Sequence, residues 1–439
     1  MQKEIFFISH IFLLTFTYDF NYDEANLTSA HLLGGSGKYD FGLRKLSNGF
    51  RVVNGRHKSL FPRSRLMVTF FSLPRFFAYE AIADAGIEPK DIQAAWLGTQ
   101  LPTDGLEGNC GIWLADYLGI FDIPVGRCTA ACASGMEAFR NAVFGVASGK
   151  HDIVLVVGVE KMRDIGPRML IDFVAERGHP CIRKGVSFPG FFAIMFNRYL
   201  YRYGISPEMG RKYLTQITTQ NHYNGSLNPK AHFQKPVTEE EILNSPKVAE
   251  PIHLLDCCPT TDGGAAIVLM RKKVAKEMKK NMIHIRGLSK YVSWPWNEGF
   301  DARLALTSFD HSVKAAQDIY QQANIKNPVE DLDVVEVHDC FSPAQFMDME
   351  DLGLSEKGKI GELLLDGLFT LDGKLPVNTG GGVLCSGHPV GATGPRMLYV
   401  LTKQLQGKAG TFQVRGDPHI GLAQNLGGYA LVVTVILSN

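Results

Sequence analysis

The segment Ile153–Val159 constrains the fold most, because its sequence IVLVVGV is apolar without a break. A strand that is buried on one face alternates apolar and polar residues, whereas a strand that is buried on both faces is apolar throughout. The run also has the length of a strand. We therefore predict a central strand in a sheet that helices cover on both sides.

From about Phe77 onward, helical patterns alternate with short β-branched runs, which is typical of a layered α/β fold. The second half of the chain repeats the order of elements in the first half. The expected elements are helices at Phe77–Gly86, Ser312–Ala323 and from Ser342, a strand end, turn and helix within Arg127–Gly149, and strands at Ile92–Gly98, Ala265–Met270, Ile283–Gly287, Asp333–His338 and Tyr429–Leu437.

These patterns divide the chain into three parts. Residues 1–75 do not join the α/β alternation, and we expect an atypical N-terminal segment there, with an altered start such as a frameshift as the working hypothesis. Residues 76–272 form the first half, in which about 160–255 are rich in aromatic residues, histidine and proline and predict an inserted loop domain. Residues 273–439 form the second half.

Composition excludes several classes of function. A chain of 439 residues is too long for a small binding module. Its 45 basic and 44 acidic residues give a net charge of +1, which offers no electrostatic footprint for nucleic acid or an anionic membrane. The longest apolar candidate, Ile5–Thr17, falls short of the roughly 20 residues that span a bilayer. Eight scattered cysteines without zinc-type spacing predict a reduced, cytoplasmic protein and no metal site.

Cys132 is the first candidate for chemistry. It lies in AACASG, between a strand-like segment and a helix whose first turn holds small residues. At a helix N-terminus, free backbone N–H groups and the helix dipole favour thiolate, so we expect a pKa below the usual value of about 8.5 and a nucleophile. The alternative is a buried, inert cysteine, which is the commoner fate of a lone cysteine.

His388 is the second candidate, because it lies in a glycine-rich stretch that begins with NTGGG and ends with GHPVGATG. Placed near Cys132, this histidine would accept the thiol proton and hydrogen-bond a developing oxyanion. The alternative is a structural histidine in a loop. The stretch lacks the Lys-Ser/Thr ending of a P-loop and the spacing of a Rossmann motif, so nucleotide binding is a weak interpretation.

The third candidate group is His338-Asp339-Cys340-Phe341, which follows a predicted strand, where functional residues of open α/β sheets gather. Cys340 would act as an acid and base at a carbon next to a thioester, and His338 would donate to the thioester oxygen. The alternative is that Cys340 packs in the core and Asp339 caps the next helix.

In this order, CASG, the Gly158/Glu160/Lys161/Met162 motif, HDCF, NTGGG, GHPxGATG and a closing QNLGG resemble the thiolase superfamily, and particularly its sterol-carrier-protein-type and archaeal branch. The resemblance implies a five-layered αβαβα fold of two similar halves with a loop domain over coenzyme A. It also implies ping-pong acyl transfer, with coenzyme A as substrate or product and no permanently bound cofactor.

Carried over by motif, Cys132 matches the acylated nucleophile, His388 the histidine that activates it, and Cys340 the acid/base cysteine. Most thiolases place the second cysteine in a C-terminal Cys-x-Gly, where this chain has Asn425-Leu426-Gly427, and the branch with HDCF supplies it from that motif instead. His338 then takes an oxyanion-hole role, and the N–H groups of Cys132 and Gly427 form the other hole. Cys385 is a weaker substitute for Cys340.

The leading hypothesis is an acyltransferase of lipid metabolism that cleaves a 3-oxoacyl-CoA with CoA or condenses acetyl-CoA units. The alternatives are a retro-aldol lyase acting on a CoA thioester and a non-catalytic subunit of a thiolase-like complex, both disfavoured by the retained Cys132, Cys340 and His388. The resemblance further implies a homodimer or homotetramer and a small zinc-ribbon/OB-fold partner protein. The aromatic residues of Phe188–Tyr203 either line an acyl pocket or, as we prefer, form a core helix.

Overall fold

The computed structural model describes residues 72–101, 110–163, 185–278, 282–293 and 306–439, and the backbone of four short strands before them. The chain forms two compact units, one of Met1–Thr17 with Thr69–Asn439 and one of Tyr18–Val68. Every candidate site residue lies in the larger unit. The four short strands are β1 (Ile5–Phe7) and β2 (Leu13–Leu14) in the larger unit and β3 (Lys45–Leu46) and β4 (Gly49–Phe50) in the smaller one.

The first half of the larger unit pairs its strands in the order β6, β5, β7, β10, β1, and β2 also pairs with β10. The central strand β7 is buried from Val154 to Glu160, which confirms the prediction from its unbroken apolar run. The elements of this half are α1 (Ser72–Ala85), β5 (Ala94–Gly98), α2 (Cys110–Leu118), β6 (Val125–Cys128), α3 (Ser134–Ala147), β7 (Ile153–Glu160), β10 (Gly263–Arg271) and α8 (Lys272–Glu277).

The second half pairs its strands in the order β11, β14, β13, β12. Strand β13 was not predicted, whereas the last predicted strand is present as β14. The elements are β11 (Ile283–Val292), α9 (Asp310–Ala323), α10 (Pro328–Asp331), β12 (Val334–Val337), α11 (Ser342–Asp351), α12 (Ile360–Leu365), α13 (Gly382–Ser386), α14 (Thr393–Leu405), β13 (Ile420–Gly427) and β14 (Leu431–Ser438).

The two halves follow one pairing scheme. Outward from the β1–β11 junction, each half has two antiparallel pairs and then a parallel pair, β1–β10–β7–β5 in one and β11–β14–β13–β12 in the other. A further parallel neighbour follows in both, β6 beside β5 and Val377 beside Val335 of β12. The two similar halves expected from the sequence are thus confirmed.

Strand β1 joins the halves, although no strand was predicted there. Phe6 pairs with Met270 of β10 on one side and with His284 of β11 on the other. The backbone of the N-terminal segment therefore supplies a strand between the last strand of the first half and the first strand of the second. The proposed limits of the parts, 1–75, 76–272 and 273–439, remain predictions.

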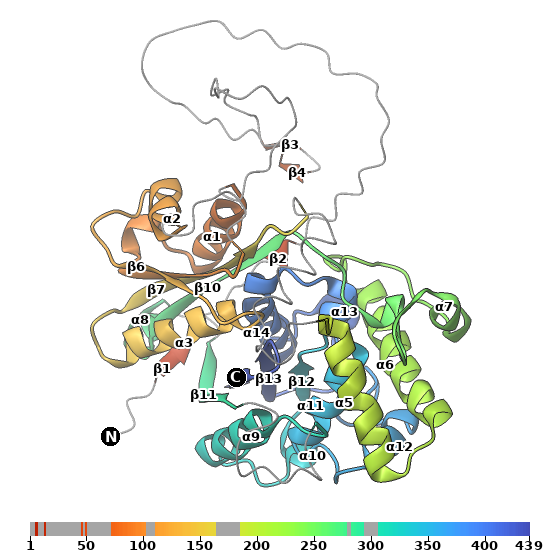
Figure 1. Ribbon diagram of the computed structural model, residues 1–439. Coiled ribbons are helices and arrows are strands. Elements are labelled where there is room, and N and C mark those ends of the chain that lie inside the picture. The colour runs from red at the N-terminus through yellow and green to blue at the C-terminus, as the bar shows by residue number, and fades with distance from the viewer. Residues whose placement is uncertain are drawn as a thin grey trace, which may run out of the picture. The chain divides into compact units, whose positions relative to one another are not determined.

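Five layers of secondary structure pack through three apolar cores, of which the middle one holds the central helices between the strands of both halves (Figure 1). Because successive side chains of a strand point to opposite faces, Val154 and Val156 of β7 pack on α3 and α14 in the central layer, whereas Leu155 and Val157 pack on α1 outside. On the strands of the second half, α9 covers the outer face through residues such as Ile319. The layers are therefore αβαβα, as the resemblance implied.

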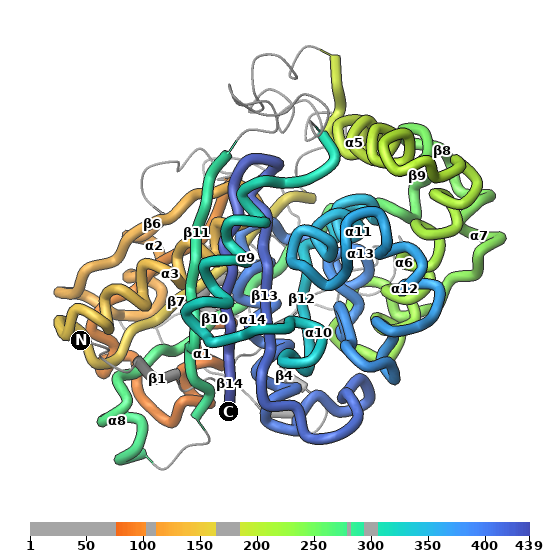
Figure 2. Tube along the Cα trace, turned by 90° about the horizontal axis from the view of Figure 1, so that it is seen from below, coloured from red at the N-terminus to blue at the C-terminus, as the bar shows by residue number. Residues whose placement is uncertain are grey.

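The inserted loop region lies between β7 and β10 and packs beside α11, α12 and α13 (Figure 2). Phe192, Phe196 and Tyr199 of α5 are fully buried, so the interpretation of Phe188–Tyr203 as a core helix is confirmed. Among the described residues, no helix has the length and apolar character needed to cross a membrane. The described elements of the region are α5 (Phe188–Tyr203), α6 (Pro207–Leu227), α7 (Glu239–Asn244), β8 (Lys247–Ala249) and β9 (Ile252–His253).

Candidate active site

Cys132 lies in a tight turn between β6 and α3. Ala131 adopts a φ of 49°, in the left-handed region that costs a non-glycine residue about 1–2 kcal/mol. The hydroxyl of Ser134 holds this turn, because it accepts from the N–H of Ala130 at 2.8 Å and donates to the carbonyl of Ala131 at 2.6 Å. The N–H of Ala131 donates to the side-chain oxygen of Gln100 at 2.9 Å. Cys132 is thereby fixed just before the first turn of α3, only 8% exposed.

His388 comes from the second half of the chain and lies against this cysteine. Its Nε2 is 3.2 Å from the Sγ of Cys132, and its Nδ1 is 2.8 Å from the hydroxyl oxygen of Thr393. The hydroxyl proton of Thr393 is directed to the carbonyl of Pro389 at 3.2 Å. The hydroxyl oxygen is then free to accept from Nδ1–H, so the hydrogen-bond network assigns the proton of the neutral ring to Nδ1. Nε2 is left as an acceptor aimed at the thiol.

Burial makes the resting pair neutral. It raises the pKa of Cys132 to about 12, although the backbone N–H of Gly428 hydrogen-bonds the sulfur and acts in the opposite direction. Burial, with a smaller contribution from the charge of Arg396, lowers the pKa of His388 to about 3. The sequence-based expectation of a lowered thiol pKa was therefore wrong, because desolvation of the thiolate outweighs the helix N-terminus. A base must remove the thiol proton during attack, and His388 is in position to do so.

His338 lies at the end of β12, beside this pair. Its ring centroid is 5.1 Å from that of His388, and its Nδ1 is 3.2 Å from the side-chain nitrogen of Asn425, which donates to it. The neutral ring therefore carries its proton on Nε2, and this atom has no hydrogen-bond partner among the described residues. Burial holds the pKa of His338 well below its usual range. A buried N–H without an acceptor can bind an oxyanion.

A ring nitrogen of His338, one of His388 and the sulfur of Cys132 all lie within 4.8 Å of one another. One thiol and two imidazoles also suit a soft divalent metal ion. In the network assigned here, however, Nε2 of His338 carries a proton and is a donor, so a metal would require this ring to change tautomer. The same three atoms fit nucleophile, base and oxyanion donor without any change.

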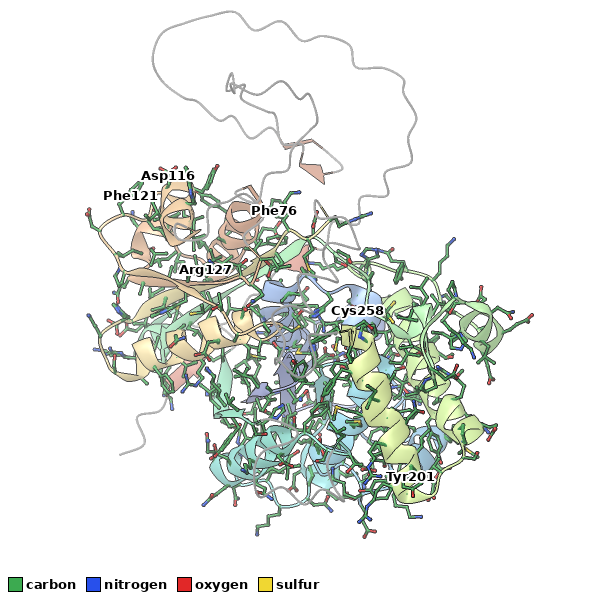
Figure 3. The ribbon with its side chains drawn as sticks, viewed as in Figure 1. Phe76, Asp116, Phe121, Arg127, Tyr201 and Cys258 are labelled. Carbon is green, nitrogen blue, oxygen red and sulfur yellow. The ribbon has the colours of Figure 1, made fainter. Side chains whose placement is uncertain are left out.

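Cys340 is buried two residues after His338, and a third cysteine of the site, Cys258, lies opposite it. Cys258 (Figure 3) donates its N–H to the carbonyl of Cys340 at 3.0 Å, and Cys257 forms an antiparallel bridge with Phe341. Antiparallel pairing puts Cys258 opposite Cys340, with both side chains on one face. Burial raises the pKa of Cys340 well above its usual value, and the nearby Cys258 and Cys132 add to this. The three thiols thus lie within electrostatic range of one another.

Cys385 and Asp339 have other contacts, whereas Gly427 lies at the site. Cys385 is tied to the loop region, because its sulfur lies 3.1 Å from the carbonyl oxygen of Phe233. Asp339 accepts from the N–H groups of Val383 and Leu384, so it caps α13 instead of the helix that follows it in sequence. Gly427 ends β13 beside the nucleophile turn.

Several site residues were missed by sequence reasoning. Thr393 and Asn425 stand within quoted motifs, but their roles depend on which histidine nitrogen they meet. Gln100 lies outside every motif, in the loop after β5, and its contact with Ala131 joins residues that are 31 positions apart. The position of Gln100 after a strand end was the available signal.

Comparison with known proteins agrees with this architecture. Residues 62–273 match the family description "Thiolase, N-terminal domain", and residues 295–439 match "Thiolase C-terminal domain-like". An acetyl-CoA acetyltransferase of Methanothermobacter thermautotrophicus is 38% identical over 79% of this chain and 88% of its own length. Sterol carrier protein 2 of Gallus gallus is 32% identical over 84% of this chain and 68% of its own length.

Solved structures share the fold at lower identity. The "Ltp2-ChsH2(DUF35) aldolase" matches with a TM-score of 0.70 and 24% identity, covering 84% of this chain and 92% of the other. An acetyl-CoA acetyltransferase from Syntrophomonas wolfei matches with a TM-score of 0.63 and 21% identity over 84% and 93%.

Proposed function

The chain belongs to the thiolase family, in the branch of the archaeal acetyl-CoA acetyltransferases and sterol carrier protein 2, and from this premise we propose that Cys132 is its acylated nucleophile. It is an acyl-CoA acyltransferase that cleaves a 3-oxoacyl-CoA with CoA or condenses acetyl-CoA units. The observation that carries the site assignment is the 3.2 Å contact between Cys132 and an imidazole whose other nitrogen is held by Thr393.

In the first half-reaction, the thiol proton of Cys132 moves to Nε2 of His388 as the sulfur attacks the carbonyl carbon of the acyl donor. This transfer converts two neutral groups into an ion pair only when substrate is present, which suits a buried site. The N–H groups of Cys132 and Gly427 would stabilise the oxyanion that forms at this carbon. Collapse of the adduct breaks the bond to the leaving group and leaves an acyl-Cys132 thioester.

Cys340 acts on the other carbon centre. In the cleavage direction its thiol donates a proton to the α-carbon of the departing acetyl-CoA enolate, and in condensation the thiolate removes that proton. The enolate oxygen would accept from Nε2–H of His338, the buried donor that has no partner among the described residues. In cleavage, the thiol of incoming CoA then attacks the acyl-Cys132 thioester and gives its proton to the Cys340 thiolate, while the departing Cys132 sulfur takes back the proton held on Nε2 of His388.

The remaining assignments are also proposals. The match to thiolase structures, one of them in complex with CoA, supports acyl-CoA substrates held under the loop region. A small zinc-ribbon/OB-fold partner is supported by the likeness to the Ltp2-ChsH2(DUF35) aldolase. A homodimer or homotetramer, a cytoplasmic location and a role in lipid metabolism complete the proposal.

Intact-protein mass spectrometry after brief incubation with acetyl-CoA or acetoacetyl-CoA tests the nucleophile. We expect an acetyl adduct on the native chain and on Cys128→Ser, a matched control that removes a half-buried thiol four residues away. Cys132→Ser should show no adduct. An adduct that survives this substitution would refute the assignment.

A cleavage assay on the same Cys132→Ser variant separates the thiolase from the retro-aldol lyase. A lyase needs no covalent acyl intermediate, so cleavage of a 3-hydroxyacyl-CoA by Cys132→Ser at the native rate would favour that alternative. The neutral Cys132–His388 pair supports the thiolase instead, since a lyase has no use for it.

A further inference from the structure

Glu160 ends strand β7 and is completely buried. Its Oε1 accepts from the hydroxyl of Thr99 at 2.9 Å and from the N–H of Leu101 at 2.7 Å. Its Oε2 accepts from the N–H groups of Gln100 and Gly391, both at 2.9 Å. One carboxylate thus joins two segments far apart in sequence, the loop after β5 and the turn that follows His388.

Each of these segments holds one member of the reacting pair. Gln100, fixed by Glu160 through its backbone, accepts from the N–H of Ala131, the residue before Cys132. Gly391 lies three residues after His388, in the turn that leads to Thr393. Glu160 therefore links the loop that supports Cys132 to the turn that follows His388. These links connect the two residues whose sulfur and Nε2 lie 3.2 Å apart.

Backbone packing brings these segments together but does not fix their register. A Cβ at Gly391 would lie 2.5 Å from the carbonyl oxygens of Gly98 and Val159, and one at Gly135 would lie 2.1 Å from the oxygen of Gly391. Such close approach needs glycine at both positions. This close packing depends on shape alone. The four hydrogen bonds to Glu160 are directional, so they fix the position of each loop relative to the other.

The burial of this charge is costly to the fold. Desolvation raises the pKa of Glu160 to about 7, against the opposing effect of its hydrogen bonds. Since the folded pKa exceeds the ordinary value of 4.5, ionisation at neutral pH lowers the free energy of unfolding. A carboxylate that opposes folding in this way, within a site, is typical of a group placed for function.

We propose that Glu160 is a positioning residue that sets the distance between Cys132 and His388 by tying their two loops together. The inference rests on the proposed function for the roles of the pair. It adds to that function a residue that does not react but sets the distance over which the proton moves from Cys132 to His388.

Glu160→Gln tests the proposal, because the amide keeps the size of the side chain but turns one acceptor oxygen into a donor that faces N–H groups. Glu350→Gln is a matched control. Glu350 is also a buried carboxylate, but it lies on α11. Its Oε1 alone accepts from the N–H groups of residues 358, 359 and 360 and from the hydroxyl of Tyr199, whereas its Oε2 has no hydrogen-bond partner among the described residues. Glutamine can therefore keep these four bonds at position 350, and the control replaces a buried carboxylate without breaking them.

We expect Glu160→Gln to lower the rate of Cys132 acetylation in a single turnover by about 10- to 100-fold, the scale of a small misplacement of reacting groups. KM for the acyl donor should change less than twofold, and Glu350→Gln should acetylate at the native rate. Equal rates for the two variants would overturn the proposal. If Glu160→Gln does not fold, Gln100→Met, which removes the acceptor of the Ala131 N–H, should show the same loss.

Alkylation of Cys132 by iodoacetamide separates this inference from the proposed function. Because His388 assists loss of the thiol proton, Glu160→Gln should alkylate as slowly as His388→Ala, with no acyl-CoA present. If the native chain forms no acyl adduct but Glu160→Gln still slows alkylation, the proposed reaction fails and the positioning role stands. Native alkylation rates in Glu160→Gln would refute the positioning role itself.

Discussion

The substitution Thr393→Val tests the proton network at its least obvious member. Thr393 touches no reacting atom, yet its hydroxyl is the acceptor that keeps the proton of His388 on Nδ1. Valine has nearly the same shape, so the start of α14 should be retained, while the acceptor is lost. The ring must then either leave Nδ1–H without a partner or move the proton to Nε2, where it can no longer accept from Cys132.

The size of the effect follows from the buried donor. An unsatisfied buried N–H costs about 1–3 kcal/mol, and each 1.36 kcal/mol is tenfold in rate, so acetylation of Cys132 should slow by about 5- to 150-fold. In either case fewer molecules have an unprotonated Nε2 of His388 held in position to accept the thiol proton. The loss should therefore appear in the rate constant of acetylation and not in the affinity for acyl-CoA.

Rapid-quench mass spectrometry of the acetyl adduct measures this rate. Thr402→Val is a matched control, because Thr402 is buried in the same helix and its hydroxyl has no hydrogen-bond partner among the described residues. Thr393→Ser keeps the hydroxyl and should acetylate within about threefold of the native rate. If Thr393→Val acetylates as fast as Thr402→Val, the assignment of the tautomer is wrong.

Three further outcomes are expected. Cys340→Ser should still form the adduct but lose turnover by at least about 100-fold in a coupled assay, and Cys385→Ser should keep both. In His388→Ala, where no base assists, iodoacetamide should alkylate Cys132 at a rate that climbs from about pH 5 to 9 without a plateau, since the thiol pKa is raised to about 12, and a plateau near neutrality would contradict this. Because the pKa of Glu160 is raised from 4.5 to about 7, the free energy of unfolding of Glu160→Gln relative to native should increase from pH 5 to pH 8 in urea titrations, and an unchanged difference would exclude the burial cost.

Local pattern was enough to predict most strands of the two halves, whereas several helices, among them α2, α6 and α14, were not predicted. The strand expected at Ile153–Val159 ends one residue later, and the helix expected at Ser312–Ala323 begins two residues earlier. Strand β13 escaped notice because the glycines and polar residues of Ile420–Gly427 conceal it, although its burial is nearly complete. The strand is buried because β12 and β14 flank it, and the sequence of a single segment does not reveal its neighbours.

The candidate site residues were predictable and their electrostatics were not. The motifs around Cys132, His388 and His338 identify chemistry by residue type, and the structure brings the three side chains together. The sign of the pKa shift at Cys132 was wrong because a helix N-terminus is visible in sequence and the depth of burial is not. Partners such as Gln100 meet their contacts only through packing of segments from different strands, which local pattern does not encode.

The repeat of the two halves explains why a nucleophile and a base meet at all. Helix α3 precedes β7 in the first half, and α14 precedes β13 at the equivalent place in the second, so both helices lie in the central layer and pack against each other. Cys132 stands just before the first helix, and His388 in the turn before the second. Their N-terminal ends approach through Gly135 and the turn at Gly391.

The two loops occupy equivalent positions in the repeated order of elements. The loops before α3 and α14 therefore approach each other between the two halves. One half has to supply the thiol and the other the imidazole, since neither half alone contains both loops. Any perturbation that separates the halves, even one far from Cys132, should lengthen its contact with His388 before it unfolds either core.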